Sequence, residues 1–176
     1  MISYLLITLN AFLLSLDCSG APSFLQEAKY ADYIALCRIS SRERHICQLN
    51  VLEKIIGEGS SDQVFVWGGE SDCDENRDEI VGSDGDTILV AVFVLKKQEI
   101  CDSSYYALEK RAKRNLYFTS ECGNNTLSVK NGITVGCITK GYGYIDDGVF
   151  KSYQEQEERI PIRNVLDMIH SQIQKQ

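Results

Sequence analysis

The chain has 176 residues, of which 44% are hydrophobic, and a formal net charge of −7. This length suits one domain, and the hydrophobic fraction is high enough for a packed core, which argues against intrinsic disorder. The negative charge argues against a protein that binds nucleic acid through the phosphate backbone. We therefore expect a folded, single-domain protein with no nucleic-acid partner.

The chain begins with an apolar segment. Residues 2–16 carry no charge, and small residues follow Asp17. The segment is shorter than the roughly 20 residues that a membrane-spanning helix needs. This pattern is typical of a secretory signal peptide, so we assign residues 1–20 to a signal and expect a secreted, extracellular protein with no membrane attachment once the signal is removed. The alternative is a buried N-terminal helix or strand.

The next elements alternate between turn signals and β-prone runs. Ser23, with Gln26 three residues on, predicts a capped short helix over residues 24–31. Residues 33–40 and 45–56 are rich in branched apolar side chains and predict a β-hairpin, in which Cys37 and Cys47 would be cross-strand neighbours. A third strand is expected at residues 63–68.

Residues 87–95 are nearly all apolar and predict a central strand buried on both faces. A fifth strand is expected at residues 115–122, and residues 126–138 predict a hairpin whose turn is Asn131-Gly132, because both residue types tolerate positive φ. Residues 139–148 are interpreted as a loop.

The chain ends in an amphipathic pattern. Five apolar residues recur at helical spacing after Pro161, which suits a first helical turn: Ile162, Val165, Leu166, Ile169 and Ile173. Together these elements predict a mainly β protein, a small Greek-key (OB-like) barrel with a short N-terminal helix and a C-terminal helix. A β-sandwich is the alternative.

Seven cysteines are the most chemically informative residues, namely Cys18, Cys37, Cys47, Cys73, Cys101, Cys122 and Cys137. Loss of Cys18 with the signal would leave six, which in an exported chain predict up to three disulfides of open connectivity. There is no C-x-x-C pair and there are only two histidines, so no zinc site and no cofactor are expected. Asn124 begins a glycosylation sequon.

An acidic loop precedes the central strand. Residues 72–78 place Asp or Asn on alternate positions, as calcium-binding loops do. However, Arg77 stands where such a loop needs glycine, and Ser83 stands where it needs a bidentate glutamate. We interpret the segment as a solvated loop anchored by Cys73 and assign no metal site. A different, weaker calcium site is the alternative, with ligands from Asp72, Asp74, Asp78, Asp84 or Asp86.

The order of these motifs resembles the N-terminal domain of the tissue inhibitors of metalloproteinases, within the wider netrin-like group. The resemblance covers residues 18–122: a cysteine followed by a short helix, Ala31-Asp32 at the start of the first barrel strand, Cys73 before the apolar strand, and a strand ending at Cys122. It implies a netrin-like barrel over residues 21–140, followed by a loop and the C-terminal helix over residues 141–176.

The same resemblance implies a mode of inhibition. In the family, the mature N-terminal cysteine presents its α-amine and carbonyl oxygen to a protease's catalytic zinc, which accepts a ligand in its open position. Carried over, that residue would be Cys18, held by a disulfide to Cys73. The sequence departs from the family at Gly20, where a second cysteine is usual, and at Lys29-Tyr30, where the stretch after the helix lacks a cysteine.

These observations predict a secreted, non-enzymatic, protein-binding domain, with a zinc metalloproteinase as the sharpest candidate partner. No nucleophile–base pair is apparent in the sequence, so no catalytic residue is assigned. The alternative is an exported structural or adhesive domain with no inhibitory activity, and an enzyme ranks third.

Overall fold

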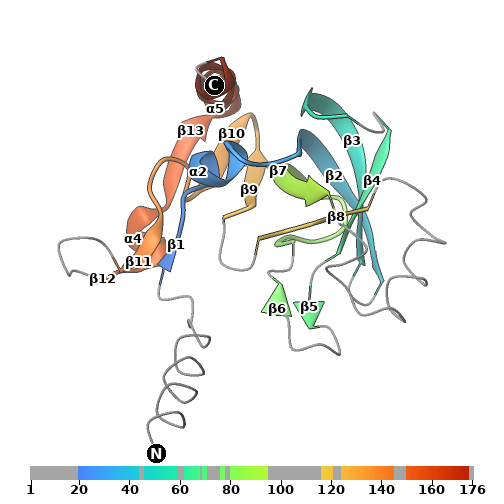
Figure 1. The fold of residues 1–176 in the computed structure, drawn as a ribbon, viewed down its shortest axis with the longest axis horizontal. Coiled ribbons are helices and arrows are strands. Elements are labelled where there is room, and N and C mark those ends of the chain that lie inside the picture. Colours follow the sequence, from blue (N-terminus) through green and yellow to red (C-terminus); the bar gives the residue numbers. More distant parts are fainter. Residues whose placement is uncertain are drawn as a thin grey trace, which may run out of the picture.

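A long, bent β-hairpin starts the fold. Strand β2 (Tyr33–Glu43) pairs with strand β3 (Ile46–Ile56), and three register shifts along β2 let the hairpin curve. The protein is seen in a computed structural model (Figure 1). It describes residues 20–43, 46–58, 62–67, 69–70, 76–77, 80–94, 116–120, 124–144 and 150–174.

Five strands close into a barrel, which confirms the predicted mainly β, OB-like architecture. Strand β4 (Gln63–Trp67) pairs with β3, β8 (Leu116–Phe118) pairs with β4, and β7 (Thr87–Val94) pairs with both β8 and β2. The β4–β8 pairing is parallel and the other four are antiparallel, so the chain crosses over between its third and fifth barrel strands in Greek-key fashion.

The barrel interior is an apolar core that contains two tyrosine rings in tilted contact. The centroids of Tyr33 and Tyr117 are 5.0 Å apart, and the Tyr117 hydroxyl donates to the carbonyl oxygen of Glu58. The buried residues of this core are Tyr33, Ala35, Cys37, Ile39, Cys47, Leu49, Val64, Val66, Ile80, Ile88, Val90, Val92 and Tyr117.

The sheet continues beyond the barrel. Strand β9 (Thr126–Lys130) pairs with the first half of β7, β10 (Ile133–Gly136) pairs with β9, and β13 (Glu158–Pro161) pairs with β10. The β9–β10 turn has positive φ at Asn131 (52°) and Gly132 (75°), which confirms the predicted hairpin. Strand β13 is not among the predicted elements, because its four residues carry no alternation long enough to recognise.

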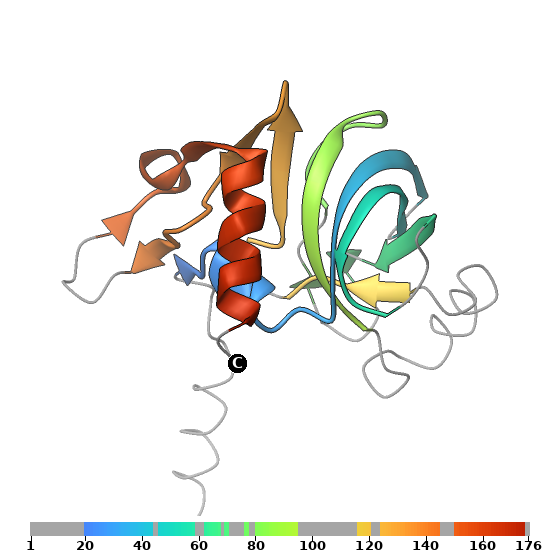
Figure 2. The same cartoon turned by 90° about the horizontal axis from the view of Figure 1, so that it is seen from above.

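Two helices cover one face of this extension. Helix α2 (Phe24–Ala28) starts at the predicted capping box, in which Ser23 Oγ accepts from Gln26 N and Gln26 Oε1 accepts from Ser23 N. Helix α5 (Ile162–Ile173) begins after Pro161 and buries Val165 and Ile169, as its spacing predicts. In Figure 2, α5 (red) lies on the side of the extension and apart from the barrel.

Strand β7 belongs to both cores, which confirms the expectation that both its faces are buried. Ile88, Val90 and Val92 face the barrel interior. Leu89 and Ala91 pack in the second core with helices α2 and α5. An apolar side chain at nearly every position is therefore required by its place between two hydrophobic layers.

Short elements complete the described chain. Strand β1 (Gly20–Ala21) pairs with β11 (Tyr142–Tyr144), which also pairs with β12 (Phe150–Lys151), and a single-turn helix α4 (Tyr153–Gln156) follows. Strands β5 (Gly69–Glu70) and β6 (Asn76–Arg77) form a separate ribbon. Within the predicted loop over residues 139–148, the interpretation is wrong for residues 142–144, because pairing with β1 and β12 makes them a strand.

Candidate functional site

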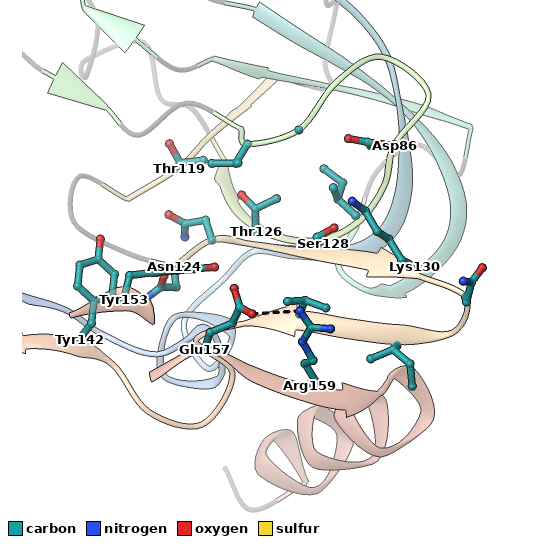
Figure 3. A pocket seen from close by; sticks show the side chains of 17 residues that line it. Asp86, Thr119, Asn124, Thr126, Ser128, Lys130, Tyr142, Tyr153, Glu157 and Arg159 are labelled. Atoms are coloured by element: carbon teal, nitrogen blue, oxygen red, sulfur yellow. Dashed lines mark ion pairs between the residues drawn. The ribbon is translucent and has the colours of Figure 1, made fainter. Parts of the chain in front are cut away.

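A cavity of about 1230 Å³ lies on the face of the extension that the helices leave uncovered. Its floor is formed by β9, β10 and β13, and the turn over residues 81–86 faces it from the barrel side (Figure 3). Tyrosines from β11 and α4 line one end.

Strand alternation explains the chemistry of the floor. Leu127 and Val129 of β9 pack toward the helices, so Thr126, Ser128 and Lys130 project into the cavity. The alternation of polar and apolar residues is visible in the sequence, but it indicates only that one face of the strand is polar.

The strand register sets a row of side chains across the floor. Ser128 pairs with Ile88 on one side and Val135 on the other, and Val135 pairs with Arg159. Ile88 is also part of the barrel core. The row therefore begins with Ile88 at the edge of the barrel core. It continues through the Ser128 hydroxyl and the apolar Val135 side chain, and it ends at the Arg159 guanidinium group.

Two acidic and two basic side chains line the cavity: Asp86, Lys130, Glu157 and Arg159. The Glu157 Oε1 atom is 3.6 Å from Arg159 Nη2, and the Arg159 side chain is 75% exposed. An exposed ion pair of this kind contributes about 0–1 kcal/mol, so the guanidinium group retains donors for a ligand. Among the described lining residues the formal charges therefore balance.

The cavity has an aromatic end. The ring centroids of Tyr142 and Tyr153 are 5.6 Å apart in an edge-to-face arrangement with an interplanar angle of 78°. Tyr153 starts helix α4, whose first turn is fixed by hydrogen bonds from Ser152 N and Oγ to Glu155 Oε2, both 2.8 Å. Burial raises the pKa of the Tyr153 hydroxyl, so this group stays protonated and able to donate.

The turn opposite the floor is held by hydrogen bonds to the barrel. Gly85 N donates to Ile39 O at 2.8 Å, Ile39 N donates to Asp86 O at 2.9 Å, and Ser83 N donates to Asp86 Oδ2 at 2.9 Å. This turn carries Val81, whose side chain is 76% exposed at the cavity.

Asn124, the predicted glycosylation residue, lies at the cavity wall. Its Nδ2 atom donates to the Pro22 carbonyl oxygen at 2.5 Å, which ties the N-terminal segment to this wall. The neighbouring Asn125 is buried and its Oδ1 accepts from Ser120 N and Oγ, both at 3.0 Å. A glycan on Asn124 would displace the bond to Pro22, and glycosylation stays a prediction.

The predicted cysteine sites separate into two groups. Cys37 and Cys137 are buried free thiols, and Cys47 is also buried. No disulfide is seen among the described residues, and the disulfide framework stays a prediction. The register pairs Cys37 with Val51, and Cys47 with Arg42, so the two cysteines are not cross-strand partners. The remaining four, Cys18, Cys73, Cys101 and Cys122, lie outside the described residues.

Burial raises the pKa of the Cys37 thiol to about 12 and that of the Cys137 thiol to about 11. Both groups are therefore uncharged near neutral pH, and neither has the character of a reactive thiolate.

The described residues hold no group of three or more His, Cys, Asp or Glu side chains that would bind a metal ion. Of the acidic loop, Asp84 and Asp86 lie in the turn before β7, whereas residues 71–75 and 78–79 fall outside the described chain. None of the described helices has the length and apolarity that a membrane span requires.

The sequence alone does not predict this cavity. Its lining residues come from five separate segments, and long-range strand pairing brings them together: Asp86, Ser128, Tyr142, Tyr153 and Arg159. In comparisons with known proteins, the sequence matches no protein-family model and no curated protein.

Proposed function

We propose that the protein is a secreted, non-enzymatic binding module that receives part of a protein partner in the cavity between the barrel and the β9–β10–β13 extension. The observation that carries this proposal is a concentration of exposed apolar side chains. Six large hydrophobic residues of the described chain are exposed, and three of them, Val81, Ile133 and Tyr153, line this one cavity. Exposed apolar groups gathered at one site, beside polar ones, are typical of binding surfaces.

The lining chemistry supports binding over catalysis. The described lining residues present hydroxyl, amide and balanced charged groups, and neither histidine nor cysteine is among them. Within the described part of the cavity, no imidazole or thiolate lines the floor beside the serine and threonine hydroxyls to form a nucleophile–base pair.

The direct test is capture by the immobilised full chain from the extracellular fraction of the source organism. The cavity variant Ile133→Glu places a charge at the apolar rim. The matched control Leu52→Glu changes a residue of similar exposure on β3, outside the cavity lining. We expect some captured proteins to bind the parent chain and the L52E variant but not the I133E variant. Identical capture by both variants would refute the cavity as the binding site.

A second candidate is inhibition of a zinc metalloproteinase through Cys18, as the netrin-like resemblance implies. The supporting observation is the anchoring of the residues that follow Cys18: Gly20 and Ala21 pair with Gly143 and Tyr142, and Pro22 accepts from Asn124. An anchored segment would hold a preceding N-terminus in a constant position, as a zinc-binding α-amine requires.

The inhibitor candidate is tested with the chain prepared to start at Cys18, assayed against a panel of zinc metalloproteinases. The control carries one extra alanine before Cys18, which moves the α-amine and leaves the fold intact. Inhibition by the first protein and not the second is expected. If neither inhibits, the protein is a binding module without this activity, such as an exported structural or adhesive domain.

A further inference from the structure

We infer that the cavity binds a neutral, hydroxyl-rich saccharide, so that the part of the partner it receives is a glycan. This inference rests on the proposed function and specifies the ligand of the same site. Four properties of the cavity carry it: a floor whose β9 and β10 strands have no free edge, a set of hydroxyl and amide side chains, balanced charge among the described lining residues and an aromatic end.

The main chain of β9 and β10, the two inner strands of the floor, is already paired on both sides. Strand β9 lies between β7 and β10, and β10 lies between β9 and β13. An extended peptide is commonly recognised by adding a strand to a free sheet edge, with its main-chain groups supplying the affinity. The two central strands of this floor offer no such edge, so an occupant here must be recognised by side chains.

The side chains that face the occupant can both donate and accept. Thr126 and Ser128 supply hydroxyl groups along the floor, and Asn124 and Asn131 supply amides at its two ends. Hydroxyl and amide groups match the hydroxyl groups of a sugar, which likewise act as donor and acceptor. Val135, which is half-buried, lies beside Ser128 and supplies apolar surface for the C–H groups of a sugar ring.

The balance of charge selects against ionic ligands. Asp86 and Glu157 offset Lys130 and Arg159 in the lining, and the whole chain is negatively charged. A polyanion such as a nucleic acid or a sulfated polysaccharide would meet two carboxylates in the cavity, and burying an unpaired charge there is costly. A neutral ligand uses all four groups as hydrogen-bonding partners.

The aromatic end suits the apolar face of a sugar. Tyr142 and Tyr153 stand edge to face at the end of the floor where Asn124 lies (Figure 3). Tyrosine combines a flat apolar ring with a hydroxyl that remains able to donate. The five residues of β9 extend over about 13 Å, a length that fits a short oligosaccharide better than a single sugar.

The first experiment titrates the ¹⁵N-labelled full chain with neutral trisaccharides built from glucose, galactose, mannose or N-acetylglucosamine, and with a heparin-derived tetrasaccharide as the anionic probe. We expect at least one neutral trisaccharide to shift amide signals of β9, β10 and α4, with a dissociation constant at least tenfold lower than that of the heparin probe. Failure of every neutral probe, or binding of heparin alone, would overturn the inference.

Two cavity variants test the assigned groups. Thr126→Val with Ser128→Ala removes the floor hydroxyls with little change in shape, and Tyr153→Leu removes the aromatic face. The matched controls are Ser171→Ala on α5 and Tyr30→Leu, because Tyr30 is also exposed (69%) and neither control residue lines the cavity. Cavity variants should weaken the trisaccharide at least tenfold and controls less than twofold. Equal affinities in folded variants would overturn the assignment.

Enzymatic deglycosylation of captured proteins separates this inference from the proposed function. If capture depends on Ile133 and is lost after deglycosylation, both stand. If capture depends on Ile133 but survives deglycosylation, the inference of a saccharide ligand would be overturned, and the proposal of a protein-binding cavity would stand. Capture indifferent to Ile133→Glu would refute the proposed function, while the trisaccharide titration would still decide the saccharide.

Discussion

Asp32 Oδ2 accepts a hydrogen bond from the main-chain nitrogen of Val94 at 2.8 Å, across 62 residues of sequence. Asp32 precedes β2, and Val94 is the last residue of β7. The β2–β7 ladder ends at the pair of Tyr33 and Val92, so the carboxylate continues the contact where main-chain pairing stops. The bond thus links the start of the first barrel strand to the end of the fourth.

We predict that Asp32→Ala lowers the free energy of unfolding by about 1 kcal/mol, the usual net value of one hydrogen bond. Asp32→Asn keeps an acceptor oxygen in the same place and should cost less than half as much. Urea unfolding of the three proteins, followed by circular dichroism, measures both differences. If the alanine and asparagine variants lose the same stability, the negative charge, and not the acceptor, is what matters at this position.

Gly57 and Gly85 form a matched pair of glycines, which allows the free-energy cost of a steric clash with an added methyl group to be measured. Both have positive φ, 103° and 90°. A methyl group at Gly57 would collide with the Asp32 carbonyl oxygen and lie 2.9 Å from Tyr33 Cδ2, whereas a methyl group at Gly85 would meet no atom within 4 Å. The two substitutions therefore share a backbone penalty and differ in the steric one.

We expect Gly85→Ala to cost about 1 kcal/mol, from the left-handed backbone alone. Gly57→Ala should cost about 2 kcal/mol more, because the barrel wall must move to admit the methyl group. Thermal and urea unfolding of both variants gives the comparison. Equal losses would mean that the strand end at Gly57 relaxes without cost.

Local signals in the sequence predicted the elements whose cause is local. The Ser23–Gln26 capping box, the Asn131-Gly132 turn and the spacing after Pro161 each depend on residues within a few positions of one another, and the structure has α2, the β9–β10 hairpin and α5 there. The apolar run of β7 was equally informative, because burial on both faces leaves no polar position.

Elements that depend on distant partners were not predicted. Tyr142 to Tyr144 form a strand through pairing with Gly20 and Ala21 on one side and with β12 on the other, and β13 is paired with β10. The cavity has the same origin, since Ser128 and Arg159 lie on opposite sides of Val135 through two strand pairings. The hydrophobic periodicity of one segment indicates its own secondary structure, but it does not show which distant segment it pairs with.

Thiol chemistry gives a test of the cysteine arrangement. Cys37, Cys47 and Cys137 are all buried, and the pKa of Cys37 is raised to about 12 by burial. Because the thiolate is the reacting species, we expect the folded protein to leave these three unmodified by iodoacetamide at pH 8, and full modification in urea.

Peptide mass mapping after alkylation, without reduction, reads the state of each cysteine separately. The denatured and alkylated protein is the positive control for accessibility. A disulfide-linked peptide that contains any of these three cysteines would contradict the described arrangement and would favour the disulfide framework that the sequence alone predicts.

Glu158 is expected to make the free energy of unfolding depend on pH below neutrality. Burial alone would raise the pKa of its carboxyl group, but hydrogen bonds from Thr139 N to Oε2 at 2.6 Å and from Thr139 Oγ1 to Oε1 at 2.7 Å favour the ionised form, and the net pKa is lowered. A lowered pKa in the folded state means that this contribution to stability is complete above the ordinary pKa of a glutamate. It is lost as pH falls toward the folded value.

We therefore expect Glu158→Gln to destabilise the protein at pH 7 and to flatten the decline in unfolding free energy between about pH 5 and pH 3. Thr139→Val should shift the same profile in the same direction by a smaller amount, because the bond from the Thr139 main-chain nitrogen remains. Urea unfolding at half-unit pH intervals measures the profiles. The β10–β13 pairing places Glu158 opposite Gly136, so a profile unchanged by Glu158→Gln would show that the carboxylate does not help to hold β13 against the floor of the cavity.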